Sequence, residues 1–310
     1  MPTASDRSRL ISIVQSRQNA RVRELRAAFV RSGREVSEVI GIEGEHLIAE
    51  ALRSDVRLRT VFVRRDVERR DGSLRVLDRL ALPAAVPIVE LTAAVFDSAV
   101  ETESPQGIAA LVEIPRFSLA EALTGAQGQV AAGFGARAKF GEGAKFGAQT
   151  RLVAQPLVVV TAGLQDPGNF GTLVRSAEAF GASGVIALPG TVSVWNSKAL
   201  RASAGSAFRV PVIAEKPAAA FEALRERKIP VLAAVAAGTD GKAIPCSAVD
   251  LAGPAAILIG NEGSGLSGEL LERAAQRIAI PMPGGVESLN AAIAGSVLLY
   301  EAARQRGARP

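Results

Sequence analysis

Short apolar runs and helix-like stretches alternate along the second half of the chain, from Pro156 onward. The apolar runs, which predict strands, are residues 157–161, 185–188, 231–235, 255–259 and 277–280. The stretches with a helical period are residues 169–180, 197–208, 219–227, 267–275 and 288–304. Strands that are apolar on both faces and separated by helices are typical of a mostly parallel sheet that is covered on both sides. We therefore predict an α/β domain over residues 156–310.

A weaker alternation in the first half predicts a smaller α/β domain over residues 37–115. Its helix- and strand-like stretches are residues 45–52, 60–63, 74–80, 87–89 and 108–113. Residues 1–36 precede it as a basic arm, which the pattern predicts to be helical from about Asn19 to Arg31.

A change of composition separates the two halves. Seven glycines lie between Gly125 and Gly147, within a near-repeat of Phe-Gly units over residues 134–147. Two full copies are too few for a solenoid, which needs about three or more stacked units. Because Gly- and Ala-rich sequence of this kind is typical of flexible connections, we predict a linker over residues 116–155.

Three polar, glycine-containing loops follow predicted strands, and ligands of parallel sheets bind beyond the carboxyl ends of strands. In the first, residues 163–169, Asp-Pro-Gly signals a turn. Asn169 is the predicted N-cap of the following helix, and Arg175 lies off the apolar stripe of that helix. The second, residues 260–266, places Glu262 among three glycines, where a carboxylate is hard to explain by structure alone.

The third loop, residues 281–290, precedes the last predicted helix. Ser288 is a candidate N-cap of this helix, and Asn290 in its first turn points toward the same end of the sheet. The helical period predicts a buried face formed by Leu289, Ile293, Val297 and Tyr300. Each loop alone is weak evidence, but the three in this order form a specific pattern.

Composition excludes several classes of function. With one Cys and one His, the chain cannot assemble a zinc finger or a His-rich metal centre. A Ser-His-Asp triad would require His46, which is more simply a histidine of a helix. Aromatic residues make up 4% of the chain, which argues against reading single strands mainly by stacking. No apolar run approaches the roughly 18–20 residues of a membrane span, and the N-terminus lacks the apolar core of a signal peptide, so we expect a cytoplasmic protein.

The net charge of +5 is concentrated at one end of the chain. Residues 1–36 hold eight Arg against Asp6, Glu24 and Glu35, so this arm carries the whole excess. A basic arm on an otherwise neutral protein suits a nucleic-acid phosphate backbone. A solvated basic helix without a partner is the alternative. Binding to a membrane surface fits less well, because the apolar face of the arm is thin.

These motifs resemble those of the SpoU/TrmH family of SPOUT RNA ribose methyltransferases over nearly the whole C-terminal half. The matching segments are residues 166–181, 198–211, 260–266 and 280–300. The first half resembles, more loosely, the RNA-binding domain that precedes the catalytic domain in many ribosomal-RNA members. That likeness rests on residues 43–47 and 105–109. The glycine-rich segment departs from the family pattern, so nothing is carried over to it.

The resemblance implies a SPOUT α/β-knot, in which the C-terminal segment of the sheet is threaded into a trefoil knot, an exception to the rule that chains avoid knots. It also implies a homodimer with the site near the subunit interface. The implied cofactor is S-adenosyl-L-methionine, held largely by the main chain of Gly260, Gly263, Ile280 and Leu289. No metal is needed for methyl transfer to a ribose 2′-hydroxyl.

The resemblance further implies a catalytic set, namely Asn169, Arg175, Glu262, Ser288 and Asn290. Arg175 is cast as a general base in this family, but an Arg pKa above roughly 12 makes full deprotonation costly. We expect Arg175 instead to grip the phosphate beside the target ribose and to stabilise the developing alkoxide. We expect Asn290 and Ser288 to orient substrate and loop, and Glu262 to hold its Asn or Arg partners.

The expected substrate is ribosomal RNA, because an additional RNA-binding domain accompanies the catalytic one. The expected RNA-binding residues are Arg17, Arg21, Arg23 and Arg201. A tRNA ribose methyltransferase is the nearest alternative, and a non-catalytic RNA-binding assembly protein is another. A nicotinamide-dependent Rossmann enzyme is disfavoured, because the glycine spacing differs from the dinucleotide fingerprint.

Overall fold

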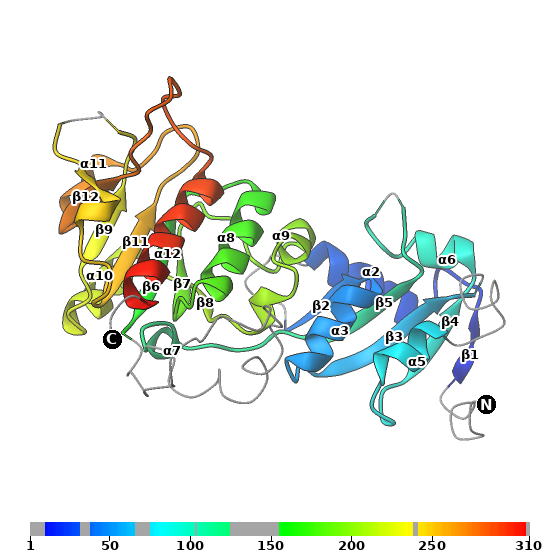
Figure 1. Cartoon of the computed structure of the whole chain (residues 1–310). Helices are drawn as coiled ribbons and strands as arrows, with labels where there is room; N and C mark the ends of the chain where they lie inside the picture. The colour runs from blue at the N-terminus through cyan, green and yellow to red at the C-terminus, as the bar shows by residue number, and fades with distance from the viewer. Residues whose placement is uncertain are drawn as a thin grey trace, which may run out of the picture. The chain divides into compact units, whose positions relative to one another are not determined.

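The protein is described by a computed structural model covering residues 10–31, 38–65, 75–102, 104–124, 155–237 and 241–307 (Figure 1). It divides into two compact units. Unit 1 comprises residues 1–116 and 193–209, and unit 2 comprises residues 117–192 and 210–310. The Phe-Gly near-repeat at 134–147 lies outside the described residues.

Unit 2 is built on a seven-stranded sheet in which every paired strand is parallel, which confirms the predicted sheet. The strand order is β10-β12-β9-β11-β6-β7-β8. The strands are β6 (Leu157–Ala162), β7 (Gly184–Leu188), β8 (Val212–Ala214), β9 (Val231–Ala234), β10 (Ile244–Pro245), β11 (Ala255–Ile259) and β12 (Gln276–Ala279). The short strands β8 and β10 were not predicted, because runs of two or three residues carry no period.

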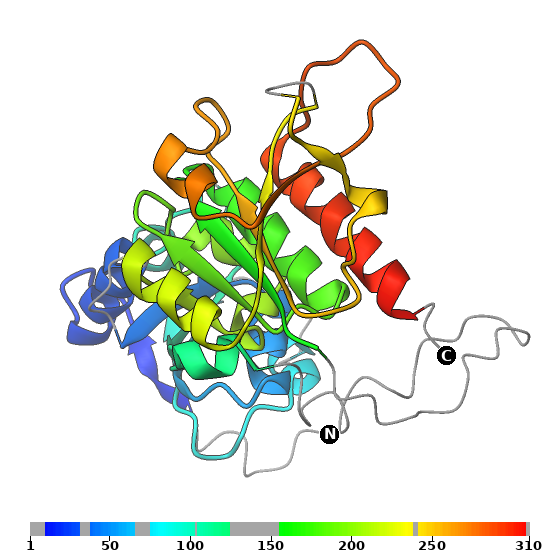
Figure 2. The same ribbon diagram turned by 90° about the vertical axis from the view of Figure 1, so that its left-hand side faces the viewer.

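Helices cover both faces of this sheet (Figure 2). Their bounds are α7 (Leu119–Ala122), α8 (Pro167–Ala179), α10 (Pro217–Glu226), α11 (Gly268–Glu272) and α12 (Ala291–Gly307), with a 3₁₀ turn η2 (Cys246–Ala248). One core cluster joins alternate residues of β6, such as Val158 and Val160, to apolar side chains of α7, α10 and α11. On the other face α8 and α12 pack together, and Gly295 lets α12 approach Leu173 closely.

The predicted buried face of α12 was wrong. Ile293 and Tyr300 are 53% and 56% exposed. The buried residues of the helix are Ala292, Gly295, Leu298, Leu299 and Ala302. Apolar residues occupy more than one side of this helix, and the side with small residues packs inward because a close approach to α8 requires it. A Cβ on Gly295 would lie 2.5 Å from Leu173 Cδ1.

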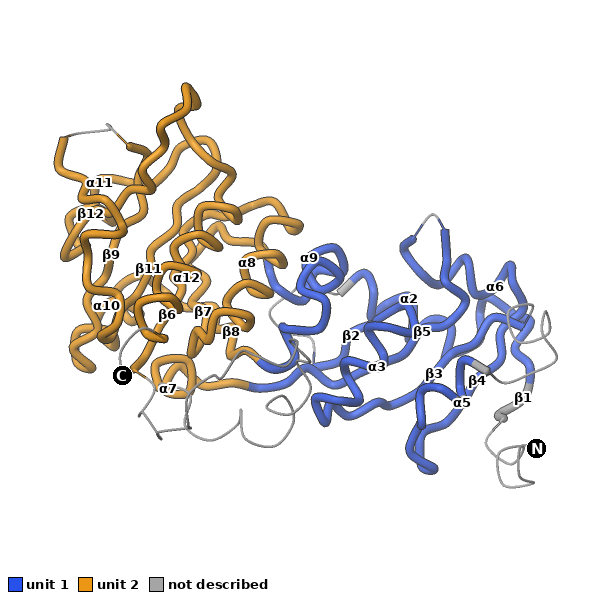
Figure 3. The backbone as a smooth tube through the Cα atoms, viewed as in Figure 1, with its two compact units in different colours: residues 1–116, 193–209 blue, residues 117–192, 210–310 orange. Residues whose placement is uncertain are grey.

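Unit 1, shown in blue in Figure 3, contains a mixed five-stranded sheet with the order β1-β4-β3-β5-β2. Its strands are β1 (Leu10–Val14), β2 (Val39–Glu43), β3 (Leu58–Arg64), β4 (Ile88–Leu91) and β5 (Ile108–Glu113). Its helices are α2 (Ala20–Arg31), α3 (Glu45–Arg53), α5 (Arg75–Leu80), α6 (Ala93–Asp97) and α9 (Ser197–Ala202), with a 3₁₀ turn η1 (Ser206–Phe208). The strands β1 and β2 and helix α6 were missed by the sequence pattern.

The described part of the basic arm belongs to the fold of unit 1. Strand β1 pairs with β4. Helix α2 contributes Val22, Leu25 and Phe29 to the core beside Phe62 of β3. Arg21, Arg23 and Arg26 of this arm are therefore carried on a packed helix rather than on a free extension.

The predicted helix over residues 197–208 is interrupted in the structure. Helix α9 ends at Ala202 and η1 begins at Ser206. Between them Ala204 and Gly205 have φ values of 50° and 89°. Such left-handed residues end a helix because its hydrogen-bonded turns cannot continue through them.

Candidate active site

The three loops leave the sheet of unit 2 at one edge. Strands β6 and β11 are adjacent and parallel, and β12 follows across β9 in the same direction. Because the carboxyl ends of parallel strands meet at the same edge, residues 163–166, 260–266 and 280–290 all emerge there. The structure thus brings the three predicted loops to one edge, although β12 is not a direct neighbour of β11.

Asp166, not Asn169, is the N-cap of α8. The Asp166 carboxylate accepts a hydrogen bond from the Asn169 main-chain N–H at 2.7 Å, and Pro167 occupies the first helical turn. The prediction of Asn169 as cap was wrong, because Asp-Pro is itself a strong helix start. The side chain of Asn169 is consequently available for other contacts.

A chain of side-chain hydrogen bonds links the three loops. Asn169 Nδ2 donates to Glu262 Oε1 at 3.0 Å, and Asn290 Nδ2 donates to Asn169 Oδ1 at 3.0 Å. Asn290 Oδ1 in turn accepts from the main-chain N–H groups of Ala292 and Ile293 at 2.9 and 3.2 Å. This last contact fixes the direction of the chain, because the helix end presents donors alone.

Asn290 therefore caps α12, and the prediction that Ser288 could cap this helix was wrong. Ser288 is exposed, and residues 281–289 make no hydrogen bond within the described part of the chain. Leu289 in this loop is half-buried. The loop stands away from the sheet at the edge that carries the other two loops (Figure 2). Its main-chain donors and acceptors are open to a bound molecule.

Asn261 organises the second loop, and the sequence analysis overlooked it. Its Oδ1 accepts from the main-chain N–H groups of Gly263 and Ser264 at 2.9 and 3.0 Å. Its Nδ2 donates to Gly163 O in the first loop at 2.7 Å. An Asn that follows the first glycine after a strand, with a further glycine two residues on, is a signal for this Asx turn. Asn261 thus supports Glu262 from the loop in which both residues lie.

Gly260 is required by a close approach of main chain within the same loop. A Cβ at this position would lie 2.6 Å from the carbonyl carbon and oxygen of Gly265. The loop closes through paired hydrogen bonds between Asn261 and Gly265. Of the other predicted cofactor residues, Gly263 is exposed and Ile280, directly after β12, is half-buried.

Arg175 lies on the exposed side of α8 and forms no ion pair with any residue that the structure describes. The structure therefore connects three of the five predicted catalytic residues, Asn169, Glu262 and Asn290. It leaves Arg175 and Ser288 outside that chain of hydrogen bonds. A guanidinium that is not engaged by the protein can bind an incoming phosphate.

The predicted RNA-binding residues all fall in unit 1. Arg17, Arg23 and Arg201 are exposed. Arg21 is half-buried, and its buried Nη1 makes no hydrogen bond within the described residues. These four arginines lie before or on α2 and on α9.

Two family models match the chain. The SpoU rRNA Methylase family matches residues 156–300, and the MRM3-like substrate binding domain matches residues 19–110. The chain is 28% identical over 288 residues to the 23S rRNA (guanosine(2553)-2′-O)-methyltransferase RlmP of Bacillus subtilis, covering 93% of this chain and 97% of that relative. It is 39% identical over 155 residues to the 23S rRNA (guanosine-2′-O-)-methyltransferase RlmB of Xylella fastidiosa, covering 49% of this chain and 60% of that relative.

A solved structure of an AdoMet-bound rRNA methyltransferase from Sinorhizobium meliloti is similar over both units. It superposes with a TM-score of 0.70 at 25% identity, covering 96% of this chain and 98% of that chain. In the part of our structure that is described, no helix is both long and apolar enough to cross a membrane.

Proposed function

We propose that the chain transfers a methyl group from S-adenosylmethionine to a ribose 2′-hydroxyl of ribosomal RNA, because the SpoU rRNA Methylase family model matches residues 156–300 and a substrate binding domain model matches residues 19–110. The observation that carries this proposal is the chain of hydrogen bonds from Glu262 through Asn169 to Asn290. It joins three loops at the carboxyl edge of a parallel sheet, which is where such sheets bind their ligands.

The residues at this edge fit the cofactor. S-adenosylmethionine supplies an electrophilic methyl group, and it carries an adenine edge and an amino-acid end that need hydrogen-bonding partners. Loop 281–289 offers main-chain groups that are unused within the described residues. Gly260 permits the tight loop beside it. We assign cofactor contacts to Gly260, Gly263, Ile280 and Leu289, whose small or apolar side chains leave recognition to the main chain.

Each polar residue then has a role in placing the RNA. Arg175 binds the phosphate beside the target ribose and stabilises the negative charge that develops on the 2′-oxygen. Asn290 and Ser288 orient the ribose and the loop. Glu262 holds Asn169, which in turn holds Asn290. Positioning of this kind reduces the entropic part of the barrier.

Ribosomal RNA is favoured over tRNA because residues 19–110 match a substrate binding domain, and a relative that aligns over 93% of the chain is named for 23S rRNA. The exposed Arg17, Arg23 and Arg201 and the half-buried Arg21 are the proposed RNA contacts of unit 1. They neutralise phosphates without reading sequence. A site of action in the cytoplasm follows from a ribosomal substrate.

The exposed apolar residues Val286, Ile293 and Tyr300 support a homodimer through α12 and the loop before it. They are 61%, 53% and 56% exposed, and they all lie within ten residues of Asn290 in the sequence. A second copy of the chain would remove these side chains from water. Sedimentation of the purified protein at micromolar concentration should give twice the monomer mass.

The strand order supports a trefoil knot in unit 2. Strand β12, the last in sequence, lies between β9 and β10 rather than at an edge of the sheet. The chain then continues through loop 281–289 to α12, which packs against α8 from the start of the unit. A terminal segment inserted among earlier ones is what a threaded chain requires.

Labelled methyl transfer to unmodified ribosomal RNA, followed by mapping of ribose methylation, tests the proposed function. Wild type should label one or a few riboses, and Asn290→Ala should lose most of this activity. Equal labelling by the two proteins would refute the assigned site. Labelling of tRNA alone would favour the tRNA alternative, and binding of RNA without labelling would favour an assembly protein.

Arg175→Lys tests the role of the guanidinium separately. Because Lys keeps the charge but not the planar pair of donors, we expect a rise in KM for RNA and a fall in kcat. Near-full activity at neutral pH would exclude bidentate phosphate binding by Arg175.

A further inference from the structure

Part of the methylase sequence is folded into the substrate-binding unit. The SpoU family match runs without a break from residue 156 to residue 300, yet residues 193–209 pack in unit 1 (Figure 3). The chain leaves unit 2 after Val192, forms α9 and η1, and returns to unit 2 at Val210. We call residues 193–209 the shared segment.

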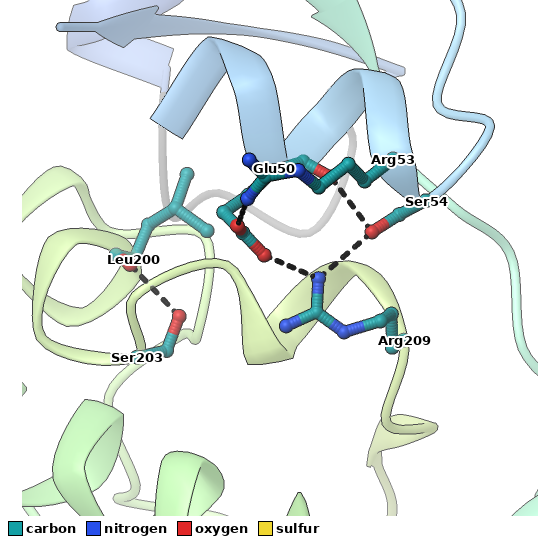
Figure 4. Close-up of polar contacts among 6 residues, drawn as sticks. All are labelled: Glu50, Arg53, Ser54, Leu200, Ser203 and Arg209. Carbon is teal, nitrogen blue, oxygen red and sulfur yellow. Dashed lines mark hydrogen bonds and ion pairs between the residues drawn. The ribbon is translucent and has the colours of Figure 1, made fainter. Parts of the chain in front are cut away.

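A buried ion pair holds the end of the shared segment against α3 (Figure 4). Glu50 on α3 is 7% exposed, and its Oε2 lies 2.8 Å from Arg209 Nη1. The same nitrogen donates to Ser54 Oγ at 3.0 Å, and the Ser54 hydroxyl donates to the main-chain oxygen of Glu50 at 2.8 Å. Arg53 reaches the other oxygen of Glu50 at 2.5 Å, but its side chain is 68% exposed. A buried carboxylate is costly unless it is paired, so Glu50 specifies the position of Arg209.

The shared segment also packs closely against α3. A Cβ on Gly205 would lie 2.5 Å from Glu50 Cβ, so the main chain of the segment runs directly against α3. Trp195 and Phe208, near the two ends of the segment, stack with ring centroids 6.2 Å apart. Ser197 at the start of α9 also donates to Glu101 Oε2 at 2.8 Å.

The two residues that precede the shared segment, Thr191 and Val192, are hydrogen-bonded to the first loop of the active site within unit 2. The main-chain N–H of Val192 donates to Leu164 O at 2.9 Å. Thr191 Oγ1 accepts from the Leu164 N–H at 3.4 Å and donates to Thr161 O at 3.3 Å. Leu164 is buried two residues before the helix cap Asp166. The chain therefore connects the loop that positions Asn169 to the helix that carries Glu50.

Helix α9, within the shared segment, carries two exposed basic side chains. Lys198 and Arg201 both project from the exposed side of α9, while Ala199 and Leu200 between them are buried. An RNA bound by α9 would thus contact a segment whose end is fixed to α3 and which follows directly on residues hydrogen-bonded to the active-site loop.

We propose that Glu50 and Arg209 are positioning residues for RNA methylation, which hold α9 so that RNA bound by unit 1 presents its target ribose to the site. This role rests on the proposed function. It predicts that loss of the ion pair impairs the use of RNA and leaves the cofactor site intact, because neither residue belongs to the loops that hold the cofactor.

Steady-state methylation of unmodified 23S ribosomal RNA by the full-length protein is the test, with Arg209→Met as the variant. Arg53→Met is the matched control, because it removes the other partner of Glu50 without touching the shared segment. We expect Arg209→Met to raise KM for RNA at least about fivefold, a typical size for coupling between two sites. We expect Arg53→Met to change KM by less than about twofold, as for an exposed ion pair. The affinity for S-adenosylhomocysteine, measured by calorimetry, should be the same in all three proteins.

A purely structural role would lower the unfolding temperature of Arg209→Met and leave KM for RNA unchanged, and this result would overturn the proposal. So would an equal rise of KM in the two variants. If Arg209→Met does not fold, Arg209→Lys should be used in its place. It should also raise KM for RNA, but by a smaller factor, since the ammonium keeps one contact to Glu50. A wild type that binds S-adenosylhomocysteine but methylates no ribosomal RNA would instead refute the proposed function itself, and the positioning role with it.

Discussion

The direction of the hydrogen-bond chain predicts the outcome of a double substitution. Asn290 Oδ1 is committed to the N–H groups of α12, so its Nδ2 must donate to Asn169 Oδ1, and Asn169 Nδ2 must donate to Glu262. Asn290→Asp keeps the helix cap, because Asp is an equally good N-cap. It also places a carboxylate on each side of the Asn169 amide. The Asn169 side chain has one NH2 group, which can donate to Glu262 or to the new carboxylate at position 290 but not to both. At the other contact the Asn169 oxygen then faces a carboxylate oxygen, and two acceptors repel each other.

The magnitude follows from the contacts. One hydrogen bond of this kind contributes about 0.5–1.5 kcal/mol, and an unmatched acceptor pair adds to the loss. Because Glu262 and Asn290 are exposed, we take about 1–2 kcal/mol for the whole effect. This corresponds to a fall of about 5- to 30-fold in kcat/KM for RNA. Glu262→Gln alone should have a smaller effect, because the new side chain can still accept from Asn169.

The two changes together should restore part of the activity. With the Asn169 amide reversed, Nδ2 donates to the new carboxylate at position 290 and Oδ1 accepts from the new amide at position 262. The assay is a double-mutant cycle on kcat/KM, with thermal unfolding as a control that the cap of α12 is retained. If the double variant is no more active than Asn290→Asp, the chain of hydrogen bonds does not act as described.

Three further predictions concern the loop, the last helix and acid. Gly260→Ala should weaken binding of S-adenosylhomocysteine in calorimetry at least about fivefold, because its Cβ would lie 2.6 Å from main chain of the same loop. Arg306→Met should lower the free energy of urea unfolding by about 2–4 kcal/mol, since Arg306 donates to four main-chain carbonyls, whereas the exposed Arg304→Met should have a much smaller effect. Hydrogen bonds from Arg304 and Gln305 lower the pKa of Glu301 to about 2. Glu301 therefore stabilises the fold above its ordinary pKa of 4.5, and the stability difference from Glu301→Gln should vanish as the pH falls through about 2.

The sequence predicted unit 2 well because its strands are apolar on both faces. Runs such as 157–161 and 255–259 are of strand length and are flanked by Pro and Gly, which favours buried strands over helices, and the loops after them are polar. Strand β8, with three residues, and β10, with two, carry too little pattern to be detected. Unit 1 was harder, because β1 lies in a stretch whose many arginines hide its apolar residues.

The sequence predicted which residues form the candidate site, but it predicted their contacts less well. Asn169 and Asn290 were both read as polar residues at helix starts, but sequence alone does not decide which neighbour provides the cap. In α8 the cap is Asp166, which frees the Asn169 side chain, and in α12 it is Asn290 itself. Asn261 was overlooked although its turn with Gly263 and Ser264 is local, and its contact with Gly163, 98 residues away, cannot be read from the sequence.

Because residues 193–209 belong to unit 1, no single cut in the chain separates the two units. A fragment cut near residue 155 would retain α9 and η1 but not α3, so Gly205 and Arg209 would lose their contacts with Glu50. An exchange of substrate-binding domains between relatives would meet the same obstacle. A well-folded chimera must take residues 193–209 and helix α3 from the same parent protein. We therefore expect these two regions to have changed together during evolution.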